Sequence, residues 1–185
     1  MNYSKIAQRY SKALFDFAEE KNQIEEIKAD MLLCAEVSKE NDAFKKMLKS
    51  PVVRSHKKLQ VIEAIFQDNV QATTLEFFKI LIKKNREEYI ENIALYYIIL
   101  YKIHFGIKTA FLEAAVELPS AAREKIIKLL EKETSAKIEM HEAINTDLIG
   151  GFRLTVEDKQ FDASIQKKIK KLGKEFSKNI YIREF

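Results

Sequence analysis

The sequence contains a single cysteine, Cys34, among its 185 residues. One cysteine cannot form an internal disulfide bond, and this is typical of a protein made in a reducing cytoplasm. No stretch of eighteen apolar residues occurs, so the sequence predicts no transmembrane helix. The opening segment MNYSKIAQRY lacks both the apolar core of a signal peptide and the arginine content of a transit peptide. We therefore expect the protein to stay in the compartment where it is made.

The patterns that carry catalysis or metal binding are also missing. The three histidines, His56, His104 and His141, are too far apart in sequence to form a metal-ligand motif. The pair Gly150–Gly151 is not followed by the Lys-Ser or Lys-Thr of a phosphate loop, and no serine nucleophile elbow occurs. Cys34 falls on the apolar stripe of a predicted helix, where it is expected as a small core residue. The sequence thus predicts no catalytic residue, no cofactor and no bound metal.

A strong charge of one sign is absent as well. The formal net charge is +4, and the excess of basic residues is small in both halves of the chain. Only the C-terminal segment is locally basic, through Lys167, Lys168, Lys170, Lys171, Lys174, Lys178 and Arg183. Such a segment binds nucleic acid or an anionic membrane in some proteins. No aromatic or arginine-rich stacking pattern accompanies these lysines, so we favour lysines that solvate the outer face of a helix packed on a sheet.

Helical periodicity is present throughout the sequence up to His104. Apolar residues recur there at spacings of three and four in six segments. Pro51 ends the third segment, because the residue before a proline is pushed out of the helical region. Thr73 with Glu76 forms a capping-box pattern that would start the fifth. The short connections between these segments predict a six-helix bundle over residues 1–105.

The period changes at Gly106, after which apolar residues alternate. Residues 110–116 predict a strand, Ser120 is the expected N-cap of a following helix, and residues 138–142 predict a second strand. A third strand follows the glycine pair, and the last helix bears the apolar stripe Ile165, Ile169, Leu172 and Phe176. Residues 106–185 are therefore predicted to form a small α/β domain, so the fold class is mainly α.

Four residues around the third strand are predicted to have structural roles. A glycine pair at a strand entry usually marks a bulge or a close approach of two backbones. We therefore expect Gly150 or Gly151 to adopt a positive φ, which other residues tolerate poorly. Asp162 or Ser164 is expected to cap the last helix.

Three segments resemble one protein family. Leu148–Ile165, LIGGFRLTVEDKQFDASI, resembles the C-terminal signature of the delta subunit of F-type ATP synthases, whose mitochondrial counterpart is the oligomycin-sensitivity-conferring protein. Arg9–Ala18, RYSKALFDFA, is similar to the family's opening helix, with Ser11 where alanine is commoner. Phe77–Arg86 resembles an apolar helix that ends in Lys-Gly-Arg; Asn85 replaces the glycine and also tolerates a left-handed C-cap. The three matches have the family's order and spacing.

The first and fifth predicted helices carry more apolar surface than one core face needs. Their apolar arcs span roughly 200°, whereas a stripe a little over 100° wide is sufficient. The surplus is either buried inside the bundle or meets a partner. In the family these two helices form the groove that receives an N-terminal helix of the alpha subunit. The resemblance implies this role for Ala7, Tyr10, Ala13, Leu14, Phe77, Ile80 and Leu81.

The resemblance implies a stator protein without an active site. The N-terminal domain would cap the alpha/beta catalytic head, and the C-terminal domain would hold the b subunits of the peripheral stalk. One copy per complex would stop the head from turning with the rotor. We expect a peripheral protein at the cytoplasmic face of a bacterial inner membrane, with no membrane insertion and no nucleic-acid partner. The alternative is a helical adaptor with a basic, nucleic-acid-binding C-terminal unit; an enzyme would need a pocket with convergent polar groups.

Overall fold

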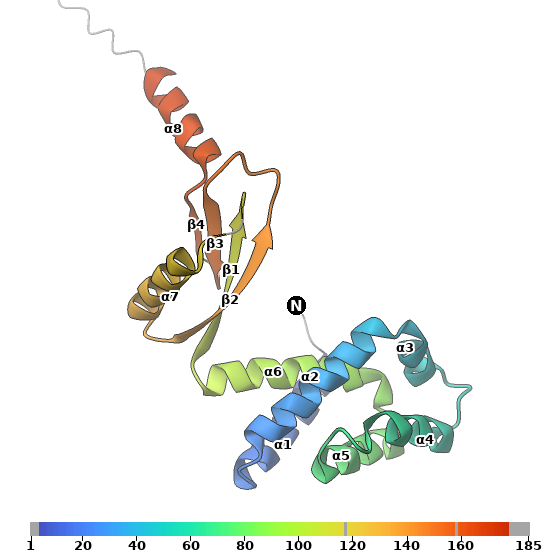
Figure 1. Cartoon of the computed structure of the whole chain (residues 1–185). Helices are drawn as coiled ribbons and strands as arrows, with labels where there is room; N and C mark the ends of the chain where they lie inside the picture. Colours follow the sequence, from blue (N-terminus) through green and yellow to red (C-terminus); the bar gives the residue numbers. More distant parts are fainter. Residues whose placement is uncertain (1–3, 117, 158, 178–185) are drawn as a thin grey trace, which may run out of the picture. The chain divides into compact units, whose positions relative to one another are not determined.

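The computed structural model describes residues 4–116, 118–157 and 159–177. The chain divides into two compact units, Met1–Phe105 and Gly106–Phe185, which we call the N-terminal and the C-terminal unit. The first is helical, and the second combines a small sheet with helices (Figure 1). The predicted fold class, a helical bundle followed by a small α/β part, is confirmed.

The N-terminal unit is built around its last helix. Its described elements are α1 (Lys5–Glu20), α2 (Ile24–Glu40), α3 (Asp42–Lys49), α4 (Ser55–Phe66), α5 (Ala72–Lys83), the 3₁₀ turn η1 (Glu87–Tyr89) and α6 (Ile90–His104). Helix α6 packs against both α1 and α2, whereas α5 packs on α4. Tyr97 of α6 is the largest fully buried side chain among the described residues. Burial of apolar surface around α6 is therefore the main force that holds the unit together.

A buried hydroxyl joins α1 to α6. Ser11 is fully buried, and its Oγ donates a hydrogen bond of 2.7 Å to the carbonyl oxygen of Ile93. The serine is tolerated in the core because its hydroxyl has this partner. The hydrogen bond also orients α1 about its own axis.

The start of α5 corrects a prediction. The helix begins at Ala72 and not behind a Thr73–Glu76 capping box, and its N-cap residue Gln71 makes no side-chain capping bond. The cap comes from α2 instead: Asp30 Oδ2 accepts hydrogen bonds from the Gln71 backbone N–H at 3.0 Å and from Thr74 Oγ1 at 2.5 Å. A carboxylate that is distant in sequence thus bonds to the first turn of α5, where the local pattern had predicted a capping box.

The end of α5 follows the sequence prediction. Asn85 has φ +54°, and its backbone N–H donates to Ile82 O at 3.0 Å. The next N–H, that of Arg86, donates to Leu81 O at 2.8 Å. These two bonds form a Schellman motif, in which the left-handed residue is usually glycine. Asn85 therefore adopts the left-handed C-cap conformation that was expected at this position.

The C-terminal unit contains one mixed sheet. Its described elements are β1 (Ile107–Ala114), α7 (Ser120–Thr134), β2 (Lys137–Ile144), β3 (Phe152–Val156), β4 (Lys159–Asp162) and α8 (Ile165–Ser177). The strand order is β2-β1-β3-β4, with β1 parallel to β2 and antiparallel to β3. Helix α7 connects the parallel pair, and its Leu130 joins the core on one face of the sheet: Ala110, Leu112, Leu154 and Val156.

Three details of this unit differ from the predictions. Strand β1 ends at Ala114, so Val116 lies outside it and is exposed. Ser120 is the first residue of α7 and not its N-cap; Pro119 occupies the cap position without a side-chain bond. Strand β4 was not predicted, because Lys159–Asp162 is short and has a single apolar residue.

The glycine pair lies against the turn before α8. Gly151 has φ +81°, which confirms the predicted positive φ. A Cβ atom on Gly151 would lie 2.5 Å from the backbone oxygen of Ala163, and one on Gly150 would lie 2.6 Å from Ile165 Cδ1. The Ile165 N–H also donates to Gly150 O at 2.9 Å. Both glycines therefore permit a close approach, and only Gly151 also needs its special backbone conformation.

Helix α8 is capped as predicted but packed differently. Ser164 Oγ accepts a bond of 3.2 Å from the Lys167 N–H, and Asp162 Oδ1 accepts one of 2.9 Å from the Ser164 N–H. These bonds to Ser164 hold the pKa of Asp162 below its usual value. The prediction that the apolar stripe of α8 packs on the sheet is wrong. The exposed fractions of its members are Ile165 42%, Ile169 56%, Leu172 52% and Phe176 85%.

Candidate functional site

An open hollow lies between α1 and α5. It has a volume of about 380 Å³ and is lined by Tyr10, Ala13, Leu14, Phe17, Thr73, Glu76, Phe77 and Ile80. We call it the α1–α5 groove. It brings together Tyr10, Ala13, Leu14, Phe77 and Ile80, which the sequence placed on the two wide apolar arcs.

The groove exists because its two walls are held by different neighbours. Helix α1 packs on α6, and α5 packs on α4, so α1 and α5 do not close on each other. They touch through Tyr10 and Phe77, whose ring centroids are 6.5 Å apart in an edge-on arrangement. Ile80 is 51% exposed, and Ala13 is also exposed. The surplus apolar surface therefore faces solvent in the described part of the unit.

Two of the predicted groove residues lie elsewhere. Ala7 and Leu81 have no exposed surface and face the core of the N-terminal unit. Leu14 is nearly buried and lines the groove at its base. A wide apolar arc contains both kinds of position, and the helical period alone does not tell which edge of the arc faces the neighbouring helix.

Three residues that line the groove were not in the predicted set. Phe17 follows Ala13 by one helical turn, and Thr73 and Glu76 each precede a predicted residue of α5 by one turn. A spacing of four residues from a predicted groove residue was the sequence signal that could have identified all three. Thr73 and Glu76 make one end of the groove polar. The exposed Glu76 carboxylate can accept a hydrogen bond there or form an ion pair with a basic side chain.

The polar end of the groove depends on Asp30. Its carboxylate bonds the first turn of α5, so it positions the helix that carries Thr73 and Glu76. Burial raises the pKa of Asp30, and the bonds from Thr74 and Gln71 oppose that rise. Asp30 therefore positions one wall of the groove, and it is not among the residues that line the groove.

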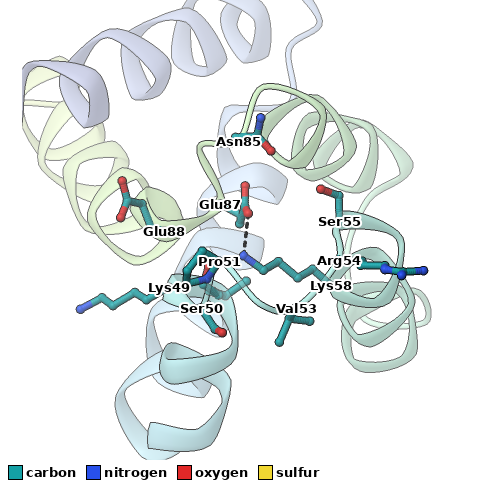
Figure 2. A pocket seen from close by; sticks show the side chains of 11 residues that line it. Lys49, Ser50, Pro51, Val53, Arg54, Ser55, Lys58, Asn85, Glu87 and Glu88 are labelled. Carbon is teal, nitrogen blue, oxygen red and sulfur yellow. Dashed lines mark hydrogen bonds and ion pairs between the residues drawn. The ribbon is translucent and has the colours of Figure 1, made fainter.

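A second hollow of about 380 Å³ lies where the end of α3, the start of α4 and η1 meet (Figure 2). Its centre is a buried ion pair, with Lys58 Nζ 2.7 Å from Glu87 Oε1. Lys58 Nζ also donates to the carbonyl oxygen of Leu48, 2.7 Å away, at the end of α3. Glu87 Oε2 is buried and has no hydrogen-bond partner within the described residues. The pair ties three elements together and is a structural feature of the bundle.

Cys34, His104 and His141 make contacts that give no indication of catalysis. Burial raises the pKa of the Cys34 thiol to about 12, so it stays protonated and is a poor nucleophile. The rings of His104 and Phe15 lie 5.3 Å apart, and His141 is bonded to Glu139 at 2.9 Å. Among the residues that the structure describes, no three histidine, cysteine or acidic side chains gather as metal ligands. The same residues include no helix that is both long and apolar enough to cross a membrane.

Sequence comparison identifies proteins that are similar over most of the chain. Residues 6–176 match the family model described as ATP synthase delta (OSCP) subunit. The chain is 29% identical over 180 residues to ATP synthase subunit delta of Cytophaga hutchinsonii, covering 97% of this chain and 98% of that protein. It is 32% identical over 168 residues to the chloroplastic ATP synthase subunit delta of Cyanidium caldarium, covering 90% and 92%.

The fold is similar to a chain in an experimental structure. That chain belongs to the cryo-EM structure of the Toxoplasma gondii mitochondrial ATP synthase hexamer, and the TM-score is 0.70. The match covers 94% of this chain and 98% of that chain at 19% sequence identity. At this identity the likeness concerns the fold, and it extends over both units.

Proposed function

This chain belongs to the ATP synthase delta (OSCP) subunit family, and from that membership we propose how its two units act. It is a stator subunit of the F-type ATP synthase and has no catalytic role of its own. Its function is therefore to bind other subunits of the complex. The N-terminal unit holds the catalytic head, and the C-terminal unit holds the peripheral stalk.

The α1–α5 groove receives the N-terminal helix of the alpha subunit. The observation that supports this is the open apolar groove itself, since an amphipathic helix binds by laying its apolar face into such a groove. Ala13 has the smallest side chain of the groove and leaves room for a guest backbone to approach. Tyr10 and Phe77 offer large apolar rings, and rings of this kind often contribute most of the binding energy of an interface.

The substitution Ala13→Asp tests this proposal. Ala13 is exposed in the free protein, so the variant should fold as the parent does. In the complex the new carboxylate would be buried without a partner, which should weaken binding by about 2 kcal/mol or more. Titration calorimetry of the full chain with a peptide that copies the alpha N-terminus measures the change.

A matched control is Ala121→Asp, the same change at an exposed helical alanine of the C-terminal unit. It should bind the peptide as tightly as the parent does. Equal binding by Ala13→Asp and the parent would show that the guest helix lies elsewhere. Unfolding of Ala13→Asp would show that Ala13 belongs to the core.

The C-terminal unit holds the b subunits of the peripheral stalk. Family membership and the exposed apolar and basic surface of α8 support this assignment. We place one copy in each complex, at the cytoplasmic face of a bacterial inner membrane; the similar protein of Cytophaga hutchinsonii supports a bacterial setting. Co-purification of ATP synthase subunits with the tagged chain from solubilised membranes tests the assembly, and an eluate without them would contradict it.

The alternative of a nucleic-acid-binding adaptor finds no support. Family membership assigns the chain to an ATP synthase. The described lysines of the basic segment lie on α8, which has no arginine and whose only aromatic residue is Phe176. This pattern lacks the stacking platforms that single-stranded nucleic acids use.

A further inference from the structure

The two rims of the α1–α5 groove carry charges of both signs. On α1, Arg9 and Asp16 border the groove, about 40° and about 60° round the helix from Ala13 on the side away from the core. On α5, Glu76 lines the groove, and Lys83 follows it by seven residues, which returns the chain to the same face. All four charged side chains are exposed. We call them the rim charges.

The two walls run in opposite directions along the groove. Tyr10 of α1 contacts Phe77 of α5. Farther along the chain, just after α1, the side chain of Gln23 accepts a hydrogen bond of 3.4 Å from Thr73 Oγ1. The chain thus advances from Tyr10 to Gln23 along one wall while the other wall goes back from Phe77 to Thr73. The end of α1 therefore lies beside the start of α5.

Like charges consequently face each other across the groove. Asp16 and Glu76 lie on opposite rims at the end that holds Thr73, and we call this the acidic end. Arg9 and Lys83 lie on opposite rims at the other end, the basic end. Within the part of the chain that the structure describes, none of the rim charges belongs to an ion pair. The free protein therefore holds two pairs of like charges beside an open apolar surface.

Neighbouring charges do not change this polarity. At the acidic end, Glu20 and Lys21 are adjacent and opposite in sign. The Lys21 amine lies over the ring of Phe17, 5.8 Å from its centroid. At the basic end, Lys84 follows Lys83 and has the same sign. The groove is therefore acidic where α5 begins and basic where α5 ends.

We infer that the rim charges select the guest of the groove. The guest is an amphipathic helix whose apolar face is bordered by basic side chains at one place and by acidic side chains about seven residues, or two turns, away. The inference rests on the proposed function, which assigns the N-terminal helix of the alpha subunit to this groove. It adds the charge pattern that this helix must carry, and with that pattern the direction in which it lies.

A guest with this pattern relieves the repulsion at both ends of the groove. A basic side chain between Asp16 and Glu76 replaces one repulsion by two attractions, and an acidic side chain between Arg9 and Lys83 does the same. The apolar floor supplies most of the affinity, whereas charges at a rim contribute specificity and the rate of association. A guest that points the wrong way, or that carries one sign throughout, meets like charges at one end at least.

The polarity argues against two other occupants. Helix α8 of a second copy exposes an apolar stripe but is strongly basic, so the basic end of the groove would repel it. An anionic membrane surface would be repelled by the acidic end. A helix that bears charges of both signs suits both ends.

Reversal of the charge at one end tests the inference. The double variant Arg9→Glu with Lys83→Glu makes both ends acidic. In titration calorimetry of the full chain, it should bind the alpha N-terminal peptide roughly fivefold more weakly than the parent, or worse, and added salt should reduce the difference. Lys39→Glu with Lys57→Glu is the matched control, because it changes the net charge equally at exposed positions of α2 and α4. It should bind as the parent does.

A compensating peptide separates charge from structure. In this peptide, lysines replace the acidic residues that border the apolar face. It should bind Arg9→Glu with Lys83→Glu more tightly than it binds the parent, which a damaged groove could not do. The opposite reversal, Asp16→Lys with Glu76→Lys, is an independent variant. It should bind a peptide whose bordering basic residues are glutamates more tightly than the parent does.

The outcomes distinguish this inference from the proposed function. If the parent does not bind the alpha peptide, the assignment of the groove is wrong. If the parent and both reversals bind it equally, that assignment stands and the rim charges do not select the guest. Failure of both compensating peptides would also overturn the inference. Dimers of the chain that Ala13→Asp abolishes would assign the groove to a second copy, and capture by phosphatidylglycerol vesicles that it abolishes would assign the groove to a membrane.

Discussion

Three buried polar side chains connect the helices of the N-terminal unit. Ser11 bonds α1 to α6, Asp30 bonds α2 to the start of α5, and Lys58 bonds α4 to the end of α3 and to Glu87. Each connects residues far apart in sequence, and each satisfies a group that would otherwise lose its hydrogen bond on burial. Apolar burial holds the helices together, and these bonds select their positions.

We expect Gly151→Ala to destabilise the C-terminal unit by about 2 kcal/mol or more, because alanine resists a positive φ and its Cβ would meet a backbone oxygen at 2.5 Å. Gly150→Ala should cost less, since its Cβ would meet only the end of the flexible, partly exposed Ile165 side chain. Urea denaturation of the two variants measures both costs. A Gly150 variant that loses more stability than the Gly151 variant would contradict this assignment.

The buried Lys58–Glu87 pair allows a double-mutant test. Lys58→Met leaves the Glu87 carboxylate buried without its partner and should cost about 3 kcal/mol or more. Adding Glu87→Met removes that charge and should restore most of the lost stability. A deficit of about 1 kcal/mol should remain, because the Leu48 carbonyl has lost its donor. A double variant as unstable as Lys58→Met would show that packing, and not charge, dominates at this site.

Asp30 makes the stability of the N-terminal unit dependent on pH. Burial raises its pKa above the ordinary 3.8, so its favourable contribution is complete below that value and is lost as the pH rises through the raised pKa. Asp30→Asn cannot ionise and keeps an oxygen for the helix cap. The stability of the parent relative to Asp30→Asn should therefore fall as the pH rises above 3.8 and through the raised pKa of Asp30. Urea denaturation of both proteins at a series of pH values measures this difference in stability. A parent that becomes more stable than Asp30→Asn as the pH rises would contradict the raised pKa of Asp30.

The prediction of the elements from sequence succeeded where the signal was local. The wide apolar arcs of α1 and α5 predicted Tyr10, Ala13 and Ile80 on one surface, and the glycine pair predicted the positive φ of Gly151. The start of α5 was missed because its capping carboxylate, Asp30, lies 41 residues before Gln71. No local pattern reports such a bond.

The C-terminal elements were harder to predict for a different reason. Strand β4 has one apolar residue in four and is formed by pairing with β3, so alternation gives almost no signal there. The stripe of α8 was correctly recognised, but its place was not, because a periodic stripe shows that a surface is apolar without showing what covers it.

The Schellman motif at the end of α5 predicts that an Asn→Gly substitution there and one in α6 change stability in opposite directions. Asn85→Gly should keep or slightly raise stability, because φ +54° suits glycine better than asparagine. Asn85→Ala should cost about 1 kcal/mol. Asn92→Gly, the same exchange in the first turn of α6, should be destabilising by roughly 0.3 kcal/mol, since glycine is a poorer helix former than asparagine. Thermal unfolding of the three variants checks the order, and equal effects of the two glycine variants would refute the special role of Asn85.

The two units each have their own core, so we expect them to fold separately. A fragment of residues 1–105 should be helical by circular dichroism and should unfold cooperatively on heating. It should also bind the alpha N-terminal peptide with the affinity of the full chain, because the whole α1–α5 groove lies within it. A fragment without helical structure would show that the N-terminal unit needs the rest of the chain.

The connection between the units also determines how a pulling force enters each of them. Gly106, with φ +61°, is almost all that separates the end of α6 from the start of β1. Helix α6 is the element against which α1 and α2 pack, and β1 has hydrogen-bonded neighbours on both sides. Tension along the chain therefore loads an inner element of each unit. Because β1 is not an edge strand, pulling it out of the sheet requires that its hydrogen-bond ladders with both β2 and β3 break. For a protein that resists torque, this is the more resistant arrangement.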